Sequence, residues 1–178
     1  MKSCNIQKLE KNFQMMKSVV YHDMLTTRGD KYRWFLRGLQ SFKYIPMNYE
    51  RGKFLEAYYV LMRHIDDVVD GDVRLPLGFE SATEFVENKI DFVKHQTKPK
   101  NPVDSLILYC FELAHDMNLD FTSETIDILS SMAFDAKRRN TLRIFSEKEL
   151  LEHFYLLDIS GTVKATLTEK VFHVGIYQ

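Results

Sequence analysis

Apolar residues recur every three or four positions along most of the chain, the spacing of a helix with one buried face. The first such run lies between about residues 5 and 25, and no alternating strand pattern persists anywhere. Seven glycines and four prolines leave few turns in 178 residues. The sequence therefore predicts an all-α fold.

Breaker and capping residues set the limits of the next two helices. A second helix is expected from Asp30, as its N-cap, to a point before Pro46. Its aromatic residues, Trp34 and Phe35 among them, are interpreted as core packing. A third helix is expected from an Asn48 cap to Gly71, followed by a loop over 72–79.

The rest of the chain carries two serine-led capping boxes. Ser81 and Ser146 each precede a glutamate by three residues, and each predicts a helix start. The helix after Ser146 is expected to run to about His173. Two further helices are expected at about 103–117 and 123–139, after an exposed connection that contains two prolines.

The third expected helix combines a wide apolar surface with one narrow charged arc. Its apolar positions cover roughly 200° of the circumference, more than the ~100° stripe of a surface helix, so it should lie deep in a bundle. The charged arc holds Tyr59, Arg63, Asp66 and Asp70, and Asp67 and Glu56 lie close beside it. We call Tyr59, Arg63 and the three aspartates the acidic strip.

The acidic strip suggests a magnesium site. Three carboxylates facing an internal cavity are costly unless a cation neutralises them. The spacing of Asp66, Asp67 and Asp70 suits Mg²⁺, which shares its remaining positions with water and substrate phosphate. Arg63 stands one turn before Asp66, where it can hold a phosphate oxygen. An ordinary solvated acidic face is the alternative interpretation.

Composition narrows the class of protein. The 24 basic and 25 acidic side chains give a net charge of −1, so no overall field favours nucleic acid. Cys4 and Cys110 lie far apart, show no metal-type spacing and fit a reducing compartment. Neither a membrane-spanning run nor a signal-peptide core is found. We expect a cytoplasmic protein with one domain over 1–178.

At this point the residues resemble a known family. Tyr59-x3-Arg63-x2-Asp66-Asp67-x2-Asp70 resembles the first aspartate-rich motif of the squalene and phytoene synthases, the head-to-head prenyltransferases. The segment Met132-Ala-Phe-Asp135 with its following arginines resembles that family's Met-x2-Asp segment. Residues 155–163, from Tyr155 to Val163, resemble its Tyr-x5-Gly-x-Val helix.

The resemblance implies a helical bundle of the isoprenoid-synthase type and Mg²⁺-dependent condensation of two prenyl diphosphates. Metal ions and cationic side chains would withdraw the diphosphate from one substrate. By this resemblance the catalytic residues are Tyr155, Asp66 and Asp70, and Asp67 supports the metal. Tyr59 and Arg63 would bind the diphosphate.

A basic cluster ends the 123–139 helix. Arg138 and Arg139 follow Lys137 there, and a helix C-terminus commonly carries such cations. The functional alternative is an anion clamp, in which these two arginines also bind substrate.

One expected part is missing from the sequence. The family's second aspartate-rich motif should follow Gly161, and none occurs before Gln178. The chain therefore resembles the N-terminal portion of the catalytic domain, apparently truncated, and activity of this chain alone is an open question.

Two alternatives to an enzyme stay open. One is a non-catalytic homologue that binds a prenyl diphosphate or a protein, and the other is a helical interaction module. Beyond the prenyl diphosphate, the open partners are a peripheral membrane contact, a second copy of the chain and a missing C-terminal segment. No nucleic acid is expected.

Overall fold

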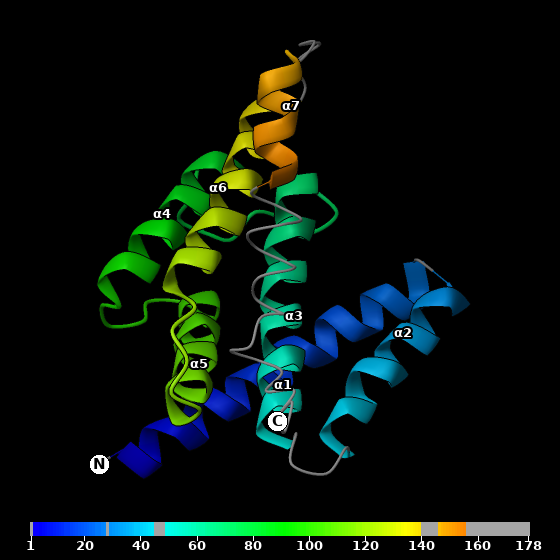
Figure 1. The fold of residues 1–178 in the computed structure, drawn as a ribbon, viewed down its shortest axis with the longest axis vertical. Helices are drawn as coiled ribbons and strands as arrows, with labels where there is room; N and C mark the ends of the chain where they lie inside the picture. The colour runs from blue at the N-terminus through cyan, green and yellow to red at the C-terminus, as the bar shows by residue number, and fades with distance from the viewer. Residues whose placement is uncertain (1, 28, 45–48, 140–145, 156–178) are drawn as a thin grey trace, which may run out of the picture. The chain divides into compact units, whose positions relative to one another are not determined.

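The computed structural model describes residues 2–27, 29–44, 49–139 and 146–155, and this part of the chain is helical without any strand (Figure 1). The predicted all-α class is confirmed. The helices are α1 (Lys2–Thr27), α2 (Asp30–Ser41), the 3-10 turn η1 (Phe42–Tyr44), α3 (Tyr49–Asp70), α4 (Ala82–His95), α5 (Pro102–Asp116), α6 (Thr122–Arg138) and α7 (Glu147–Phe154).

The start of α2 differs from the prediction by one residue. Asp30 is the first helical residue, and the N-cap is Gly29, whose φ of 81° lies in the left-handed region that glycine adopts without strain. The helix also gives way to η1 before Pro46. Asn48 lies outside the described residues, and the expected end of α3 at Gly71 and the loop after it are confirmed.

Both serine caps form, although only one makes a complete capping box. Ser146 Oγ accepts from the backbone N–H of Glu149, whose carboxylate accepts in return from the N–H of Ser146 at 3.0 Å. Ser81 Oγ accepts from the N–H of Glu84, but the Glu84 carboxylate accepts from the N–H of Glu80. Helix α7 is described to Phe154, so its expected extension to His173 lies outside the described residues.

The chain divides into two compact units. Unit 1 comprises Met1–His64 and Thr97–Asp120, and unit 2 comprises Ile65–Gln96 and Phe121–Gln178. Helix α3 is continuous and belongs to both, because the division falls within it.

In unit 1, α1 packs along α5 and contacts α2. The ring of Phe13 stacks on the ring of Tyr109 at 5.2 Å between centroids, and both side chains are buried. The side-chain amide of Asn12 donates to the carbonyl of Pro102 at 2.8 Å, at the first turn of α5. The apolar face of the first helix therefore contacts α5 at Phe13.

In unit 2, α4 packs along α6. The interior includes a fully buried lysine, Lys89, whose ammonium lies over the rings of Phe79 and Phe85 at 5.3 and 5.4 Å. Its Nζ also donates to the side chain of Asn88 at 3.0 Å. These cation–π contacts and the hydrogen bond compensate the burial of the charge. None of the described helices is long and apolar enough to cross a membrane.

Candidate functional site

The acidic strip begins in the unit 1 part of α3, with Tyr59 and Arg63. Both side chains are half-buried. The Tyr59 hydroxyl donates to the sulfur of Met24 at 3.3 Å, and the Tyr59 ring lies 5.0 Å from the ring of Phe35. A thioether sulfur is a weak hydrogen-bond acceptor.

The three aspartates of the strip lie in the unit 2 part of α3 and differ in exposure. Asp66 is half-buried, Asp67 is 1% exposed and Asp70 is exposed. Consecutive helical residues point about 100° apart, so Asp67 turns to the buried side of the helix while Asp66 and Asp70 share a face. The strip therefore changes from buried to solvated within one turn.

The different exposures of the three aspartates make Asp66 and Asp70 better candidates for metal ligands than Asp67. Among the residues that the structure describes, no group of three or more His, Cys, Asp or Glu side chains is placed to hold a metal ion. Mg²⁺ is commonly bound by one or two carboxylates together with substrate phosphates, and Asp66 and Asp70, one turn apart, fit that requirement. Asp67 fits it less well because of its burial.

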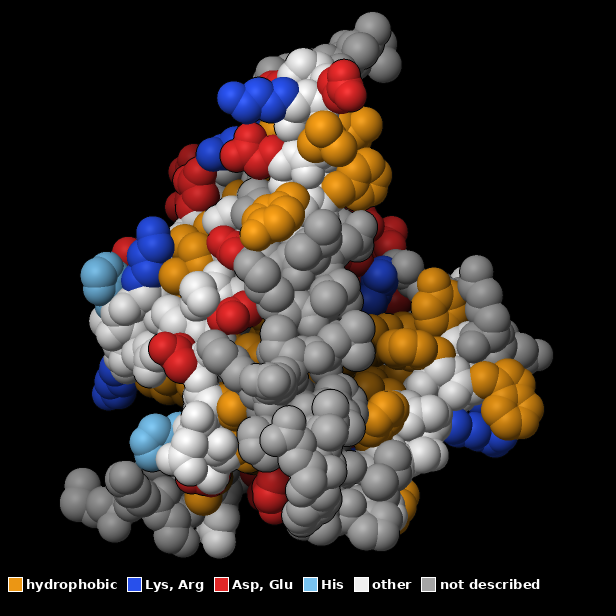
Figure 2. Space-filling view, in the orientation of Figure 1, with side chains coloured by type: hydrophobic (Ala, Val, Ile, Leu, Met, Phe, Trp, Pro, Cys, Tyr) orange, Lys and Arg blue, Asp and Glu red, His pale blue; other side chains and the backbone are white. Residues whose placement is uncertain are grey.

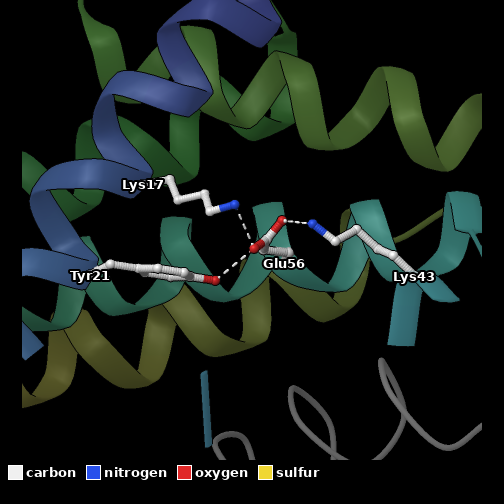
Figure 3. A network of polar contacts seen from close by, with 4 residues as sticks. All are labelled: Lys17, Tyr21, Lys43 and Glu56. Carbon is white, nitrogen blue, oxygen red and sulfur yellow. Dashed lines mark hydrogen bonds and ion pairs between the residues drawn. The ribbon is translucent and has the colours of Figure 1, made fainter. Parts of the chain in front are cut away.

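A buried glutamate on α3 forms a polar cluster that the sequence did not reveal. Glu56 is 1% exposed. Its Oε1 lies 2.8 Å from Lys17 Nζ and accepts from the Tyr21 hydroxyl at 2.8 Å, both on α1, while its Oε2 lies 2.8 Å from Lys43 Nζ on η1 (Figure 3). We call these four residues the Glu56 cluster. It ties α3 to two other segments of unit 1.

The electrostatics of this cluster follow from its geometry. Burial by itself raises the pKa of Glu56, but the hydrogen bonds from Lys17, Lys43 and Tyr21 outweigh it and hold that pKa below the ordinary value. Burial, with the adjacent Glu56 charge, raises the pKa of Tyr21 well above its usual range. The carboxylate is therefore ionised and the phenol neutral at pH 7.

Arg139 lies at the C-terminal end of α3, within unit 2. Its Nη1 donates to the carbonyl of Val69 at 3.0 Å. Gly71, at φ 75°, lies directly beneath the guanidinium, where any Cβ would collide with it. Arg139 thus caps the last turn of α3, where a cation also complements the helix dipole. The anion-clamp interpretation of Arg139 stays a proposal, and its observed partner is a backbone carbonyl.

Arg138 pairs with its own helix. Its Nη2 lies 3.2 Å from Asp135 Oδ1, and the side chain is exposed. The other oxygen of Asp135 lies 3.4 Å from Nε2 of His153 on α7, and Nδ1 of His153 lies 3.0 Å from Ser131 Oγ. This Ser-His-Asp grouping differs from a hydrolase site because Ser131 is 1% exposed, so a substrate could not reach its hydroxyl. It joins α7 to α6.

Tyr155 follows α7 and is exposed. It lines an open cavity of about 820 Å³ whose described lining comes entirely from 147–155. No residue of the acidic strip is among the residues that line this cavity. His64, which the sequence assigns to the apolar side of its helix, is half-buried, and burial lowers its pKa.

The sequence did not identify Lys17, Tyr21 and Lys43 as members of a cluster, because their common partner, Glu56, is distant in the chain. Lys17 and Tyr21 do carry a local signal: they are four residues apart on α1, and the Lys17 ammonium lies 5.3 Å from the Tyr21 ring. That spacing marks a shared face but does not identify Glu56 as what the face contacts.

Comparison of the chain with family models, with curated proteins and with solved structures finds no match.

Proposed function

We propose that the chain is a prenyl-diphosphate transferase of the squalene/phytoene synthase type, whose acidic strip binds the substrate diphosphate together with Mg²⁺. One observation carries this proposal: the strip lies on a helix that has a fully buried apolar side. Val60, Leu61, Ile65, Val68 and Val69 are all at most 2% exposed. A helix with so little exposed surface has no need of an acidic face for solubility.

The described residues suggest a division of roles in binding. Asp66 and Asp70 would hold Mg²⁺, which would neutralise charge on the departing diphosphate. Arg63, half-buried one turn earlier, offers a planar fork of donors to phosphate oxygens. Tyr59, on the same face of α3, would add its hydroxyl as a donor to a phosphate oxygen.

The Glu56 cluster supports the same helix without touching the reacting groups in this proposal. Its two ammonium groups and one phenol are satisfied by the carboxylate, and the Glu56 side chain is 2% exposed. We assign it a positioning role, in which it fixes the unit 1 part of α3 and the direction of Tyr59 and Arg63.

A second candidate is a homologue that binds a prenyl diphosphate without turning it over. The sequence holds one aspartate-rich helix, and the described residues hold no group of three metal-ligating side chains. Fewer ligands would leave the departing diphosphate less stabilised, and each 1.36 kcal/mol of lost stabilisation lowers the rate tenfold. We therefore expect the 178-residue chain to bind better than it turns over.

Thermal unfolding with and without ligand tests the binding proposal. Farnesyl diphosphate with Mg²⁺ should raise the melting temperature, because ligand at 100 times its Kd adds ~2.7 kcal/mol of stability. Mg²⁺ alone should do little. The double variant Asp66→Asn, Asp70→Asn should stay folded and lose the shift.

The matched control replaces two exposed aspartates outside α3, Asp91 on α4 and Asp116 on α5, by asparagine. This variant should keep the full shift. An unchanged shift in the Asp66, Asp70 variant would remove the basis for the assignment.

A product assay separates the two candidates. The purified chain is incubated with Mg²⁺ and farnesyl or geranylgeranyl diphosphate, and head-to-head products are sought. Binding without product supports the second candidate. Efficient turnover supports the first, provided that the Asp66, Asp70 variant abolishes it.

A further inference from the structure

Helix α2 and η1 expose three aromatic side chains that the sequence predicts to lie in the core. Trp34 is 71% exposed, Phe35 is 47% exposed and Tyr44 is 83% exposed. The core-packing interpretation is therefore wrong for Trp34 and Tyr44, whereas the ring of Phe35 is partly exposed and still contacts the ring of Tyr59. Leu36, about 200° around the helix from Trp34, is the buried one among the described side chains of α2, so this helix packs through the side that carries Leu36 and turns Trp34 outward.

The same outward side carries positive charge. Arg33 and Arg37 are exposed, and the Arg37 guanidinium lies 5.3 Å from the Trp34 ring centroid. Lys43 instead turns inward to Glu56. Among the described side chains of α2 and η1, the exposed charged ones are both arginines. Figure 2 shows hydrophobic side chains beside basic ones over this part of unit 1.

We propose that α2 and η1 form a docking surface for the headgroup region of an anionic lipid bilayer. Tryptophan and tyrosine favour the membrane interface, where the ring is shielded from water and its polar group stays hydrated. Arginines on the same helix attract anionic headgroups, and their guanidinium groups stay at headgroup level.

The charge of this surface favours a bilayer over a second copy of the chain. In a two-fold dimer the same patch would lie on both sides of the interface, so Arg33 and Arg37 of both copies would be brought into one contact region. Like charges brought together in an interface oppose association. The net charge of −1 gives no general attraction to anionic surfaces, so attraction has to come from this local patch. The proposal does not depend on prenyl-diphosphate binding.

The chain contains its own reporter of this contact, because Trp34 is its single tryptophan. Fluorescence of the full chain is titrated with phosphatidylglycerol vesicles and, separately, with phosphatidylcholine vesicles. The Trp34 emission should shift to shorter wavelength with phosphatidylglycerol only, and brominated lipid should quench it. Raising the salt concentration should reverse the shift.

Two variants make the test specific. Arg33→Gln with Arg37→Gln should raise the lipid concentration for half-binding roughly 30-fold, from about 1 kcal/mol per basic residue near an anionic surface. The control, Lys94→Gln with Lys98→Gln, removes two exposed lysines elsewhere and should bind as the wild type.

Three results would overturn the proposal. The first is sedimentation with phosphatidylglycerol vesicles without a change in Trp34 emission, which would place the contact elsewhere. The second is a blue shift that follows protein concentration in the absence of vesicles, which would identify a second copy as the occupant. The third is the absence of binding to either lipid.

Discussion

Glu56 is a residue whose surroundings reverse the ordinary effect of burial. A buried carboxylate normally holds its proton more tightly, yet three donors keep this one ionised. The lysines are each 18% exposed at the side chain, so their charges are partly hydrated while the carboxylate, at 2%, is not. Of the charged groups in the cluster, the carboxylate is therefore the one whose removal should reduce the free energy of unfolding most.

Replacing Glu56 by glutamine should lower the free energy of unfolding at pH 7 by about 2–3 kcal/mol, the usual worth of hydrogen bonds to a buried charge. The folded-state pKa of Glu56 lies below the ordinary 4.5, so the wild type gains stability above about pH 4.5 and loses it as the pH falls through the folded pKa.

Urea unfolding at pH 7 and near pH 4 measures this difference. The gap between wild type and Glu56→Gln should narrow at the lower pH. Glu112→Gln, at an exposed position of α5, is the control and should change stability little. A gap that widens in acid would contradict the assigned ionisation.

Arg63 tests whether the strip recognises phosphate geometry as well as charge. Lysine at this position keeps the charge and loses the planar fork, so Arg63→Lys should weaken diphosphate binding at least fivefold while the protein stays folded. Calorimetric titration with inorganic diphosphate and Mg²⁺ measures the change. Equal affinity in the two proteins would show that Arg63 acts as a structural partner of the aspartates.

At the scale of elements, the end of α3 depends on a glycine and an arginine that are 68 positions apart. Gly71 adopts a left-handed φ and leaves room for the Arg139 guanidinium. Gly78 offers a matched comparison, because it has a φ of 94° with no atom within 4 Å of a built Cβ. The two glycines share the backbone requirement and differ in the neighbour.

Gly78→Ala should cost about 1–2 kcal/mol from backbone strain alone. Gly71→Ala should cost about 2–4 kcal/mol, because Arg139 must also leave the carbonyl of Val69. In an Arg139→Ala background the cost of Gly71→Ala should fall to that of Gly78→Ala. A double-mutant cycle by urea unfolding measures the coupling, and strict additivity would mean that the two residues act independently.

The sequence predicted helix ends correctly where they depend on residues within about one turn of each other. The Ser146 capping box and the helix end at Gly71 both formed, because each depends on residues within one turn. The predicted burial of Trp34 was wrong because burial depends on contacts with distant parts of the chain. Periodicity shows that Trp34 and Leu36 lie on different sides of the helix, but not which side meets the rest of unit 1.

In the candidate site, too, the features that depend on local spacing could be predicted and the contacts between distant residues could not. Its strip on α3 could be read from the sequence, since it follows from helical spacing alone. The partners of Glu56 come from 13 to 39 residues away, and the partner of Arg139 comes from 70 residues away. No period in the sequence encodes contacts of that range.

At the scale of the whole molecule, the central claim is that metal and diphosphate bind together on the acidic strip. Mg²⁺ keeps several waters and gains affinity from substrate oxygens, so the two ligands should bind cooperatively. The strip lies on α3, which is one continuous helix from Tyr49 to Asp70. Binding should therefore also stabilise α3 as one continuous helix.

The most direct measurement is a calorimetric titration of the chain with farnesyl diphosphate, once with Mg²⁺ and once with a chelator. The account predicts binding at least about tenfold tighter with Mg²⁺, a difference of ~1.4 kcal/mol, and loss of that difference in the Asp66→Asn, Asp70→Asn variant. Equal affinity with and without Mg²⁺, or a metal effect that survives in the variant, would contradict it.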